Sequence, residues 1–239
     1  MIRLDAVERN FDVIEIPPKQ RGGGKRGKVG KRKTMTPFTL EELNRMVAAG
    51  KEYISEARGM REEQLRANML LCLQIGVNVG LRASDLILLT WDDLYYKDGS
   101  FKERVSIIEQ KTHKPKDFRL NAACQKFLTE YVSRYGVDTS SVGWVFYSRK
   151  GGHISVDALG DRIKQLAEKA GVYRQCATHN LRKTFAEQQL LAHAGDSLFM
   201  RDLMEMLNHS SEKVTLHYIA SDEARVMQYY DDVNLAEGD

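Results

Sequence analysis

The chain has 239 residues, 42% of them hydrophobic and 29% charged, so it is long enough and apolar enough to bury a sizeable core. Charged residues interrupt the first fifteen positions, and the longest apolar stretch is too short for a bilayer, so we expect neither a secretory leader nor a membrane span. The three scattered cysteines form no CxxC pair, which argues against a disulfide scaffold or a zinc ribbon and favours a reducing, cytoplasmic location.

The net charge of +3 conceals two parts of opposite charge. Eight of the 36 cations lie between residues 19 and 33, where no acid occurs, and the remaining 28 cations face 33 acids, which leaves the rest of the chain (residues 1–18 and 34–239) with a net charge of −5. The cationic segment also contains five glycines and one aliphatic residue, so we expect it to be disordered when free. We refer to residues 1–33 as the basic arm. The cations of residues 19–33, which we call the arm cations, are Lys19, Arg21, Lys25, Arg26, Lys28, Lys31, Arg32 and Lys33.

Two interpretations of the basic arm remain open. A segment of this composition can be a solvated linker that keeps the protein soluble. Clustered Lys and Arg side chains also release counterions from nucleic acid, which makes the arm a candidate for binding DNA phosphates.

Helix signals dominate the first part of the body, residues 34–239. Thr39 to Glu42 has the form of a capping box, so we expect a helix that begins there, runs through Ala49 and ends at Gly50. A second helix is expected at about residues 62–79 with Gly80 as its C-cap, and a short helix at residues 84–89.

The hydrophobic period changes after residue 90. Three short strands, separated by turn-forming residues, are expected to form an antiparallel meander at residues 94–96, 105–108 and 118–120. The pattern is helical again at about residues 122–135, 156–170, 180–193, 198–207 and from 211 onward. The predicted fold class is therefore mainly α with a small three-stranded antiparallel sheet (α+β).

Four short blocks of the sequence carry the functional signal. They are Gly80-Leu81-Arg82-Ala83-Ser84-Asp85-Leu86, Thr178-His179-Asn180-Leu181-Arg182, Leu207-Asn208-His209-Ser210-Ser211 and Thr215-Leu216-His217-Tyr218. Each block is a weak signal alone, but their order and local spacing resemble the tyrosine recombinase (phage integrase) family. The resemblance covers about residues 34 to 230 and implies the catalytic-domain fold of that family.

The resemblance implies a role for each of five side chains. Arg82 and Arg182 would clamp the scissile phosphate, for which the planar guanidinium is well suited. Tyr218 would attack phosphorus and form a 3′-phosphotyrosyl link. His179 would take the tyrosine proton, and His209 would hydrogen-bond the phosphoryl oxygens. The covalent intermediate keeps the bond energy, so the resemblance implies neither ATP nor a metal.

The general acid of the family is a lysine on the turn between the second and third strands. We favour Lys111, because it lies at the strand end and precedes Thr112 as in family members. Lys114 and Lys116 are the rival candidates, and otherwise they would form a basic rim that contacts the DNA backbone.

The chain departs from the family pattern in several places. Asn208 replaces the usual glycine before His209, and asparagine tolerates the positive φ that such a turn needs. Asp85 stands where glutamate is common. Only the 33 residues of the basic arm precede the catalytic domain, so we expect the arm to replace the missing core-binding domain by wrapping the duplex. The acidic tail, about residues 229–239, either packs on a neighbouring protomer or frays.

The leading hypothesis is a DNA-associated enzyme of bacterial or phage origin that cuts and rejoins double-stranded DNA site-specifically, in integration, excision or inversion. Its expected partners are DNA, further copies of itself in a tetramer on synapsed sites, and accessory DNA-bending proteins. A topoisomerase-like enzyme with the same chemistry and a DNA-binding protein without catalysis are the alternatives.

Overall fold

The computed structural model describes residues 35–212 and Thr215. The described helices are α1 (Leu40–Ser55), α2 (Met60–Val79), α3 (Ala83–Leu86), α4 (Trp91–Leu94), α5 (Ala122–Tyr135), α6 (Val156–Lys169), α7 (Thr178–Ala192) and α8 (Phe199–Met206), and the strands are β1 (Val105–Ile108) and β2 (Pro115–Phe118). The mainly α fold with a small antiparallel sheet is thus confirmed. Among these helices, none combines the length and the apolar character that a bilayer crossing requires.

The first helix begins where the sequence predicts. The Thr39 hydroxyl accepts a hydrogen bond from the Glu42 N–H at 3.1 Å, and the Glu42 carboxylate accepts one from the Thr39 N–H at 2.9 Å, so the capping box is complete. The predicted end at Gly50 is wrong, because α1 continues to Ser55. A Cβ at Gly50 would lie 2.8 Å from Cδ1 of Leu70. This glycine therefore serves close packing of α1 on α2 and does not end the helix.

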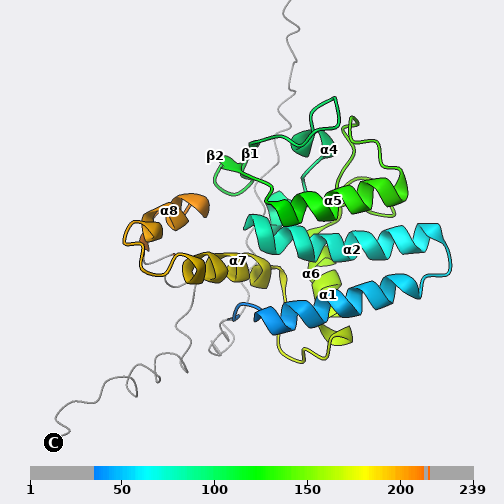
Figure 1. Cartoon of the computed structure of the whole chain (residues 1–239), viewed down its shortest axis with the longest axis horizontal. Coiled ribbons are helices and arrows are strands. Elements are labelled where there is room, and N and C mark those ends of the chain that lie inside the picture. The colour runs from blue at the N-terminus through cyan, green and yellow to red at the C-terminus, as the bar shows by residue number, and fades with distance from the viewer. Residues whose placement is uncertain (1–34, 213–214, 216–239) are drawn as a thin grey trace, which may run out of the picture. The chain divides into compact units, whose positions relative to one another are not determined.

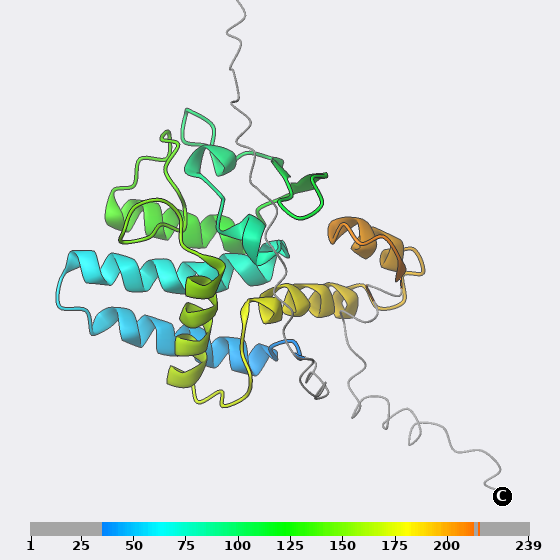
Figure 2. The same ribbon diagram turned by 180° about the vertical axis from the view of Figure 1, so that it is seen from behind.

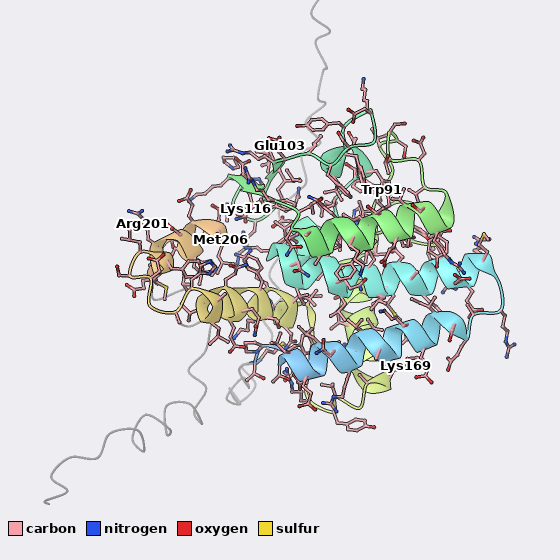
Figure 3. The ribbon with its side chains drawn as sticks, in the orientation of Figure 1. Trp91, Glu103, Lys116, Lys169, Arg201 and Met206 are labelled. Carbon is pink, nitrogen blue, oxygen red and sulfur yellow. The ribbon has the colours of Figure 1, made fainter. Side chains whose placement is uncertain are left out.

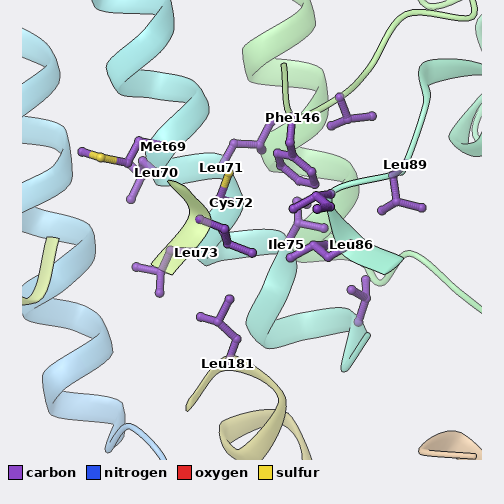
Figure 4. Close-up of a cluster of buried hydrophobic side chains, with 14 of the residues drawn as sticks. Met69, Leu70, Leu71, Cys72, Leu73, Ile75, Leu86, Leu89, Phe146 and Leu181 are labelled. Atoms are coloured by element: carbon purple, nitrogen blue, oxygen red, sulfur yellow. The ribbon is translucent and has the colours of Figure 1, made fainter. Parts of the chain in front are cut away.

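Helix α2 forms the centre of the core. It packs against α1, α5, α6 and α7; α1, α2 and α5 lie side by side (Figure 1), and α6 crosses α1 and α2, as the reverse view shows (Figure 2). Most of its second half is buried, and Figure 4 shows these side chains packed with Leu86, Phe146 and Leu181. A helix buried on all sides is typical of the middle of a helical domain.

The sheet has two strands where three were expected. Strands β1 and β2 pair antiparallel from Val105 opposite Phe118 to Ile108 opposite Pro115. The first expected strand, residues 94–96, does not form. A capping box at Thr90 starts the helical turn α4, and Leu94 is the last residue of that turn. Only one isolated bridge, between Tyr95 and Phe101, remains of that strand.

A second, smaller hydrophobic cluster attaches α8 to α7. It contains Phe185, Ala186, Phe199, Leu203 and Leu207. The hairpin of β1 and β2 lies at the same end of the molecule as α8 (Figure 1), and the Asn208 amide donates to the Pro115 carbonyl at 3.3 Å. The end of α2, the hairpin, α7 and α8 therefore converge on one region.

Two helix-ending glycines allow a matched test of packing at this region. Gly80 ends α2 at φ +62°, and a Cβ there would lie 2.3 Å from the Phe185 ring; Gly136 ends α5 at φ +59° with nothing within 4 Å of such a Cβ. Gly136→Ala should cost about 1–2 kcal/mol of unfolding free energy from backbone strain alone. Gly80→Ala should cost at least about 1 kcal/mol more, because steric overlap is added. Urea unfolding followed by circular dichroism measures both, and equal losses would contradict the packing argument.

Candidate active site

Arg82 stands at the junction between α2 and α3. The left-handed Gly80 ends α2, as predicted, and Arg82 is the N-cap residue of α3. Its Nη1 forms an ion pair with Oε1 of Glu109, whose side chain is fully buried, whereas the Arg82 side chain keeps 20% of its exposure. One edge of this guanidinium is thus fixed internally while part of the side chain still faces solvent.

The turn between β1 and β2 presents two of the predicted lysines. Lys111 and Lys114 are exposed. The turn is closed by hydrogen bonds from the His113 N–H to the Glu109 carbonyl at 2.9 Å and from the Glu109 N–H to the Lys114 carbonyl at 3.0 Å. It is tied to α3, because buried Asp85 accepts a hydrogen bond from the Gln110 N–H at 2.9 Å. The shorter aspartate therefore still reaches the hairpin.

Lys116 does not lie on the surface, where a side chain that contacts the DNA backbone would have to be. Its side chain is buried at 5% exposure, and Nζ donates to the carbonyl of Met206 at the end of α8; the two residues lie beside each other in Figure 3. Burial first, and then the charge of Arg182, lower the pKa of Lys116 to about 8. This lysine anchors the hairpin to α8. Its ammonium group points into the protein and not toward a DNA backbone at the surface.

Helix α7 carries His179 in its first turn and Arg182 one turn later. His179 is exposed, and partial desolvation, followed by the charges of Lys183, Arg182 and Lys111, lowers its pKa. Arg182 is only 2% exposed: Nη1 donates to the Gly80 carbonyl at 2.6 Å, and Nη2 donates to the Leu207 carbonyl. Arg182 therefore joins the ends of α2 and α8, a structural role that its motif did not predict.

His209 follows α8 through a Schellman turn. Asn208 has φ +48°, and the bonds from the His209 N–H to the Met204 carbonyl (2.9 Å) and from the Asn208 N–H to the Glu205 carbonyl (3.0 Å) complete the motif. The expectation that asparagine adopts the glycine conformation here is confirmed. The turn aims the His209 ring back toward α7, where Nε2 lies 3.3 Å from Nη2 of Arg182.

The His209 ring is held from both sides. Nδ1 lies 3.0 Å from the hydroxyl of buried Thr215, while Nε2 faces the Arg182 guanidinium, which can only donate. Burial first, then the charges of Arg182 and Arg82, lower the pKa of His209 to about 4. The ring is therefore neutral at pH 7, with the proton on Nδ1 and a lone pair toward Arg182.

The structure brings Arg82, Arg182 and His209 together, with the turn of Lys111 and the exposed His179 close enough for their charges to interact. Tyr218, the acidic tail and the basic-arm cations lie outside the described residues. Glu109 belongs to none of the sequence motifs; its position directly after an expected strand and two residues before Lys111 was the only signal for it.

Comparison with known proteins agrees with this geometry. The profile of the Phage integrase family matches residues 33–225. The tyrosine recombinase XerC of Xanthomonas axonopodis pv. citri (strain 306) is 31% identical over 159 residues, which is 66% of this chain and 48% of that protein. The XerC of Xylella fastidiosa (strain M23) is 30% identical over 195 residues, 82% of this chain and 62% of that protein.

Solved structures share the fold. The crystal structure of XerA recombinase superimposes with a TM-score of 0.63 at 19% identity, covering 91% of this chain and 66% of that one. The post-cleavage complex of XerH site-specific recombinase bound to palindromic difH substrate gives a TM-score of 0.61 at 21% identity, covering 83% and 53%. The chain thus spans between about half and two thirds of the length of these relatives.

The lowered pKa of His209 predicts a pH-dependent stability. Between pH 6.5 and 4 the unfolded chain binds a proton at this ring and the folded chain does not, so the unfolding free energy falls as the pH falls through this window and levels below it. His209→Asn should flatten that slope by at most about 1.4 kcal/mol per pH unit, which corresponds to one proton. Urea unfolding at several pH values measures the slope. The exposed His113→Asn is the control, and a His209→Asn slope equal to that of the wild type would refute the neutral, buried ring.

Proposed function

The chain belongs to the phage integrase family, and we propose that it is a site-specific recombinase that cleaves and rejoins double-stranded DNA through a 3′-phosphotyrosyl link to Tyr218. One observation carries the proposal: Arg82, Arg182 and His209 come from three separate segments and converge on one place. Phosphoryl transfer needs positive charge on the nonbridging oxygens and a positioned nucleophile. The exposed part of Arg82 supplies a cation that a DNA phosphate can reach.

The proposed reaction balances within the chain's own residues. The Tyr218 hydroxyl attacks phosphorus and gives its proton to His179, whose lowered pKa leaves the ring neutral and able to accept it. The bond from phosphorus to the 5′-oxygen breaks, and Lys111 gives that oxygen its proton. Rejoining runs the same steps in reverse with the 5′-hydroxyl of either strand, so the phosphotyrosyl link conserves the bond energy.

The described residues support the position of the nucleophile along the chain. Thr215 is buried and bonded to His209, and Tyr218 follows three residues later, so their Cα atoms can be at most about 11 Å apart. We propose that the active form is a homotetramer on two synapsed DNA sites inside the cell, assisted by accessory DNA-bending proteins. The acidic tail would pack on the neighbouring protomer.

The segment from Thr36 to Phe38 is bonded to the body of the protein. The Thr36 carbonyl accepts hydrogen bonds from Asn180 at 2.6 Å and from Arg174 at 3.1 Å, and the Phe38 N–H donates to Thr184 at 2.8 Å. These bonds hold this segment against the first turns of α7. We propose that residues 1–33 contact DNA phosphates through the arm cations.

The nucleophile is tested with a nicked suicide substrate, in which the cleaved strand loses the 5′-hydroxyl needed for rejoining. The wild type should trap a covalent DNA adduct on a denaturing gel, and Tyr218→Phe should abolish it because the attacking oxygen is gone. Arg82→Ala should slow adduct formation about 10²–10³-fold, the usual cost of removing one charge-stabilising donor.

The control is Tyr173→Phe, since Tyr173 is 90% exposed, and it should react as the wild type does. An adduct of equal yield from Tyr218→Phe would refute the assignment. Adduct without exchange between two sites would favour a topoisomerase-like enzyme, and binding without any adduct would favour a protein that has no catalytic activity.

The arm is tested through the salt dependence of DNA binding. Deleting residues 1–33, while keeping the bonded segment from Thr36 to Phe38, should lower affinity and flatten the log–log salt slope by about 0.9 for each phosphate that the arm neutralises in the wild type. A full-length variant with the eight arm cations changed to glutamine separates charge from length and should behave like the deletion. Fluorescence anisotropy at several salt concentrations gives both slopes, and slopes equal to that of the wild type would show that the arm is only a linker.

A further inference from the structure

Glu109 is a buried carboxylate that touches two parts of the site. Its side chain has no exposed surface, Oε1 is paired with Nη1 of Arg82, and Oε2 accepts a hydrogen bond from the Thr112 hydroxyl at 2.6 Å. Burial raises the pKa of this carboxyl, but hydrogen bonds from Thr112, Arg82 and Asn208 outweigh burial and hold the pKa below its usual range. The group is therefore ionised at neutral pH.

The backbone of Glu109 also closes the lysine turn. Its N–H donates to the Lys114 carbonyl at 3.0 Å, and its carbonyl accepts from the His113 N–H at 2.9 Å. The same residue thus fixes the turn that carries Lys111 through its backbone and fixes Arg82 through its side chain. The hydrogen bond between the Glu109 side chain and Asn208 links the turn that precedes His209 to the same carboxylate.

The charges around Glu109 explain why a carboxylate lies here. Arg82, Arg182 and Lys116 are close enough to repel one another, so the charge of each makes the charged state of the others less favourable. A buried carboxylate offsets that repulsion and orients the nearest guanidinium. Because Nη1 of Arg82 is buried against Glu109, the phosphate has to approach the part of Arg82 that stays exposed.

We propose that Glu109 is a positioning residue for DNA cleavage, which sets Arg82 and the Lys111 turn in one fixed geometry without touching the DNA itself. The inference rests on the proposed function. It adds a residue to the reaction that none of the four sequence blocks contains. Since a carboxylate near a phosphate site repels the DNA, Glu109 lowers affinity slightly and raises the rate of cleavage.

The experiment separates binding from chemistry in the full-length chain. Single-turnover adduct formation on the nicked suicide substrate gives the cleavage rate at saturation, and anisotropy of the uncut duplex gives Kd. Glu109→Ala should lower the cleavage rate about 10²-fold, as expected for a catalytic group displaced by about 1 Å, with Kd equal to or tighter than that of the wild type. Glu109→Gln should recover part of the rate, because the amide oxygen can still accept from Arg82 or Thr112.

The control is Glu103→Gln, which removes an exposed acid just before the same strand (Figure 3) and should leave rate and Kd unchanged. Circular dichroism reports the folded fraction, and if Glu109→Ala does not fold, Glu109→Gln alone carries the test. A rate equal to that of the wild type, or a rate and a Kd that worsen together in proportion to the unfolded fraction, would overturn the positioning role. A wild type that forms no adduct would refute the proposed function instead.

Discussion

The site depends on one buried cation, Arg182, and on how its charge is satisfied. Taking a guanidinium out of water costs several kcal/mol unless its donors find good acceptors. Here the acceptors are the carbonyls of Gly80 and Leu207, at the ends of α2 and α8, where the helix dipole places partial negative charge. The cation therefore needs no carboxylate partner for these two bonds. It also fixes the distance between two helix ends, and both ends lead directly into functional residues.

The same arrangement recurs at Lys116, whose ammonium binds the Met206 carbonyl one residue before the carbonyl held by Arg182. Two cations from different elements thus stabilise the end of α8, and the Schellman turn follows immediately. The position of His209 is then set by three parts of the chain that are distant in sequence. Glu109 complements these two cations. Its carboxylate pairs with one edge of the Arg82 guanidinium and leaves the rest of that side chain partly exposed.

The sequence predicted what local chemistry decides and failed where tertiary packing decides. The capping box at Thr39 and the left-handed turn at Asn208 were foreseen, because a cap or a positive φ is encoded in adjacent residues. Gly50 was misread, since a glycine that permits helix packing looks like one that ends a helix. The four motif blocks located Arg82, Arg182 and His209, but the burial of Lys116 and Glu109 could not be seen. It depends on contacts distant in sequence, of Lys116 with the end of α8 and of Glu109 with Arg82.

This placement of charge also resolves the conflict between an acidic body and a polyanionic ligand. At physiological ionic strength an exposed charge is screened over about 8 Å, so the five excess acids outside residues 19–33 act weakly at the site. Buried Arg182 and Lys116 are screened much less, and they set the local potential. Under the proposed function, the eight arm cations would supply affinity along the duplex while the buried cations maintain the geometry of the chemistry. Affinity could then change through the arm without any change at Arg182.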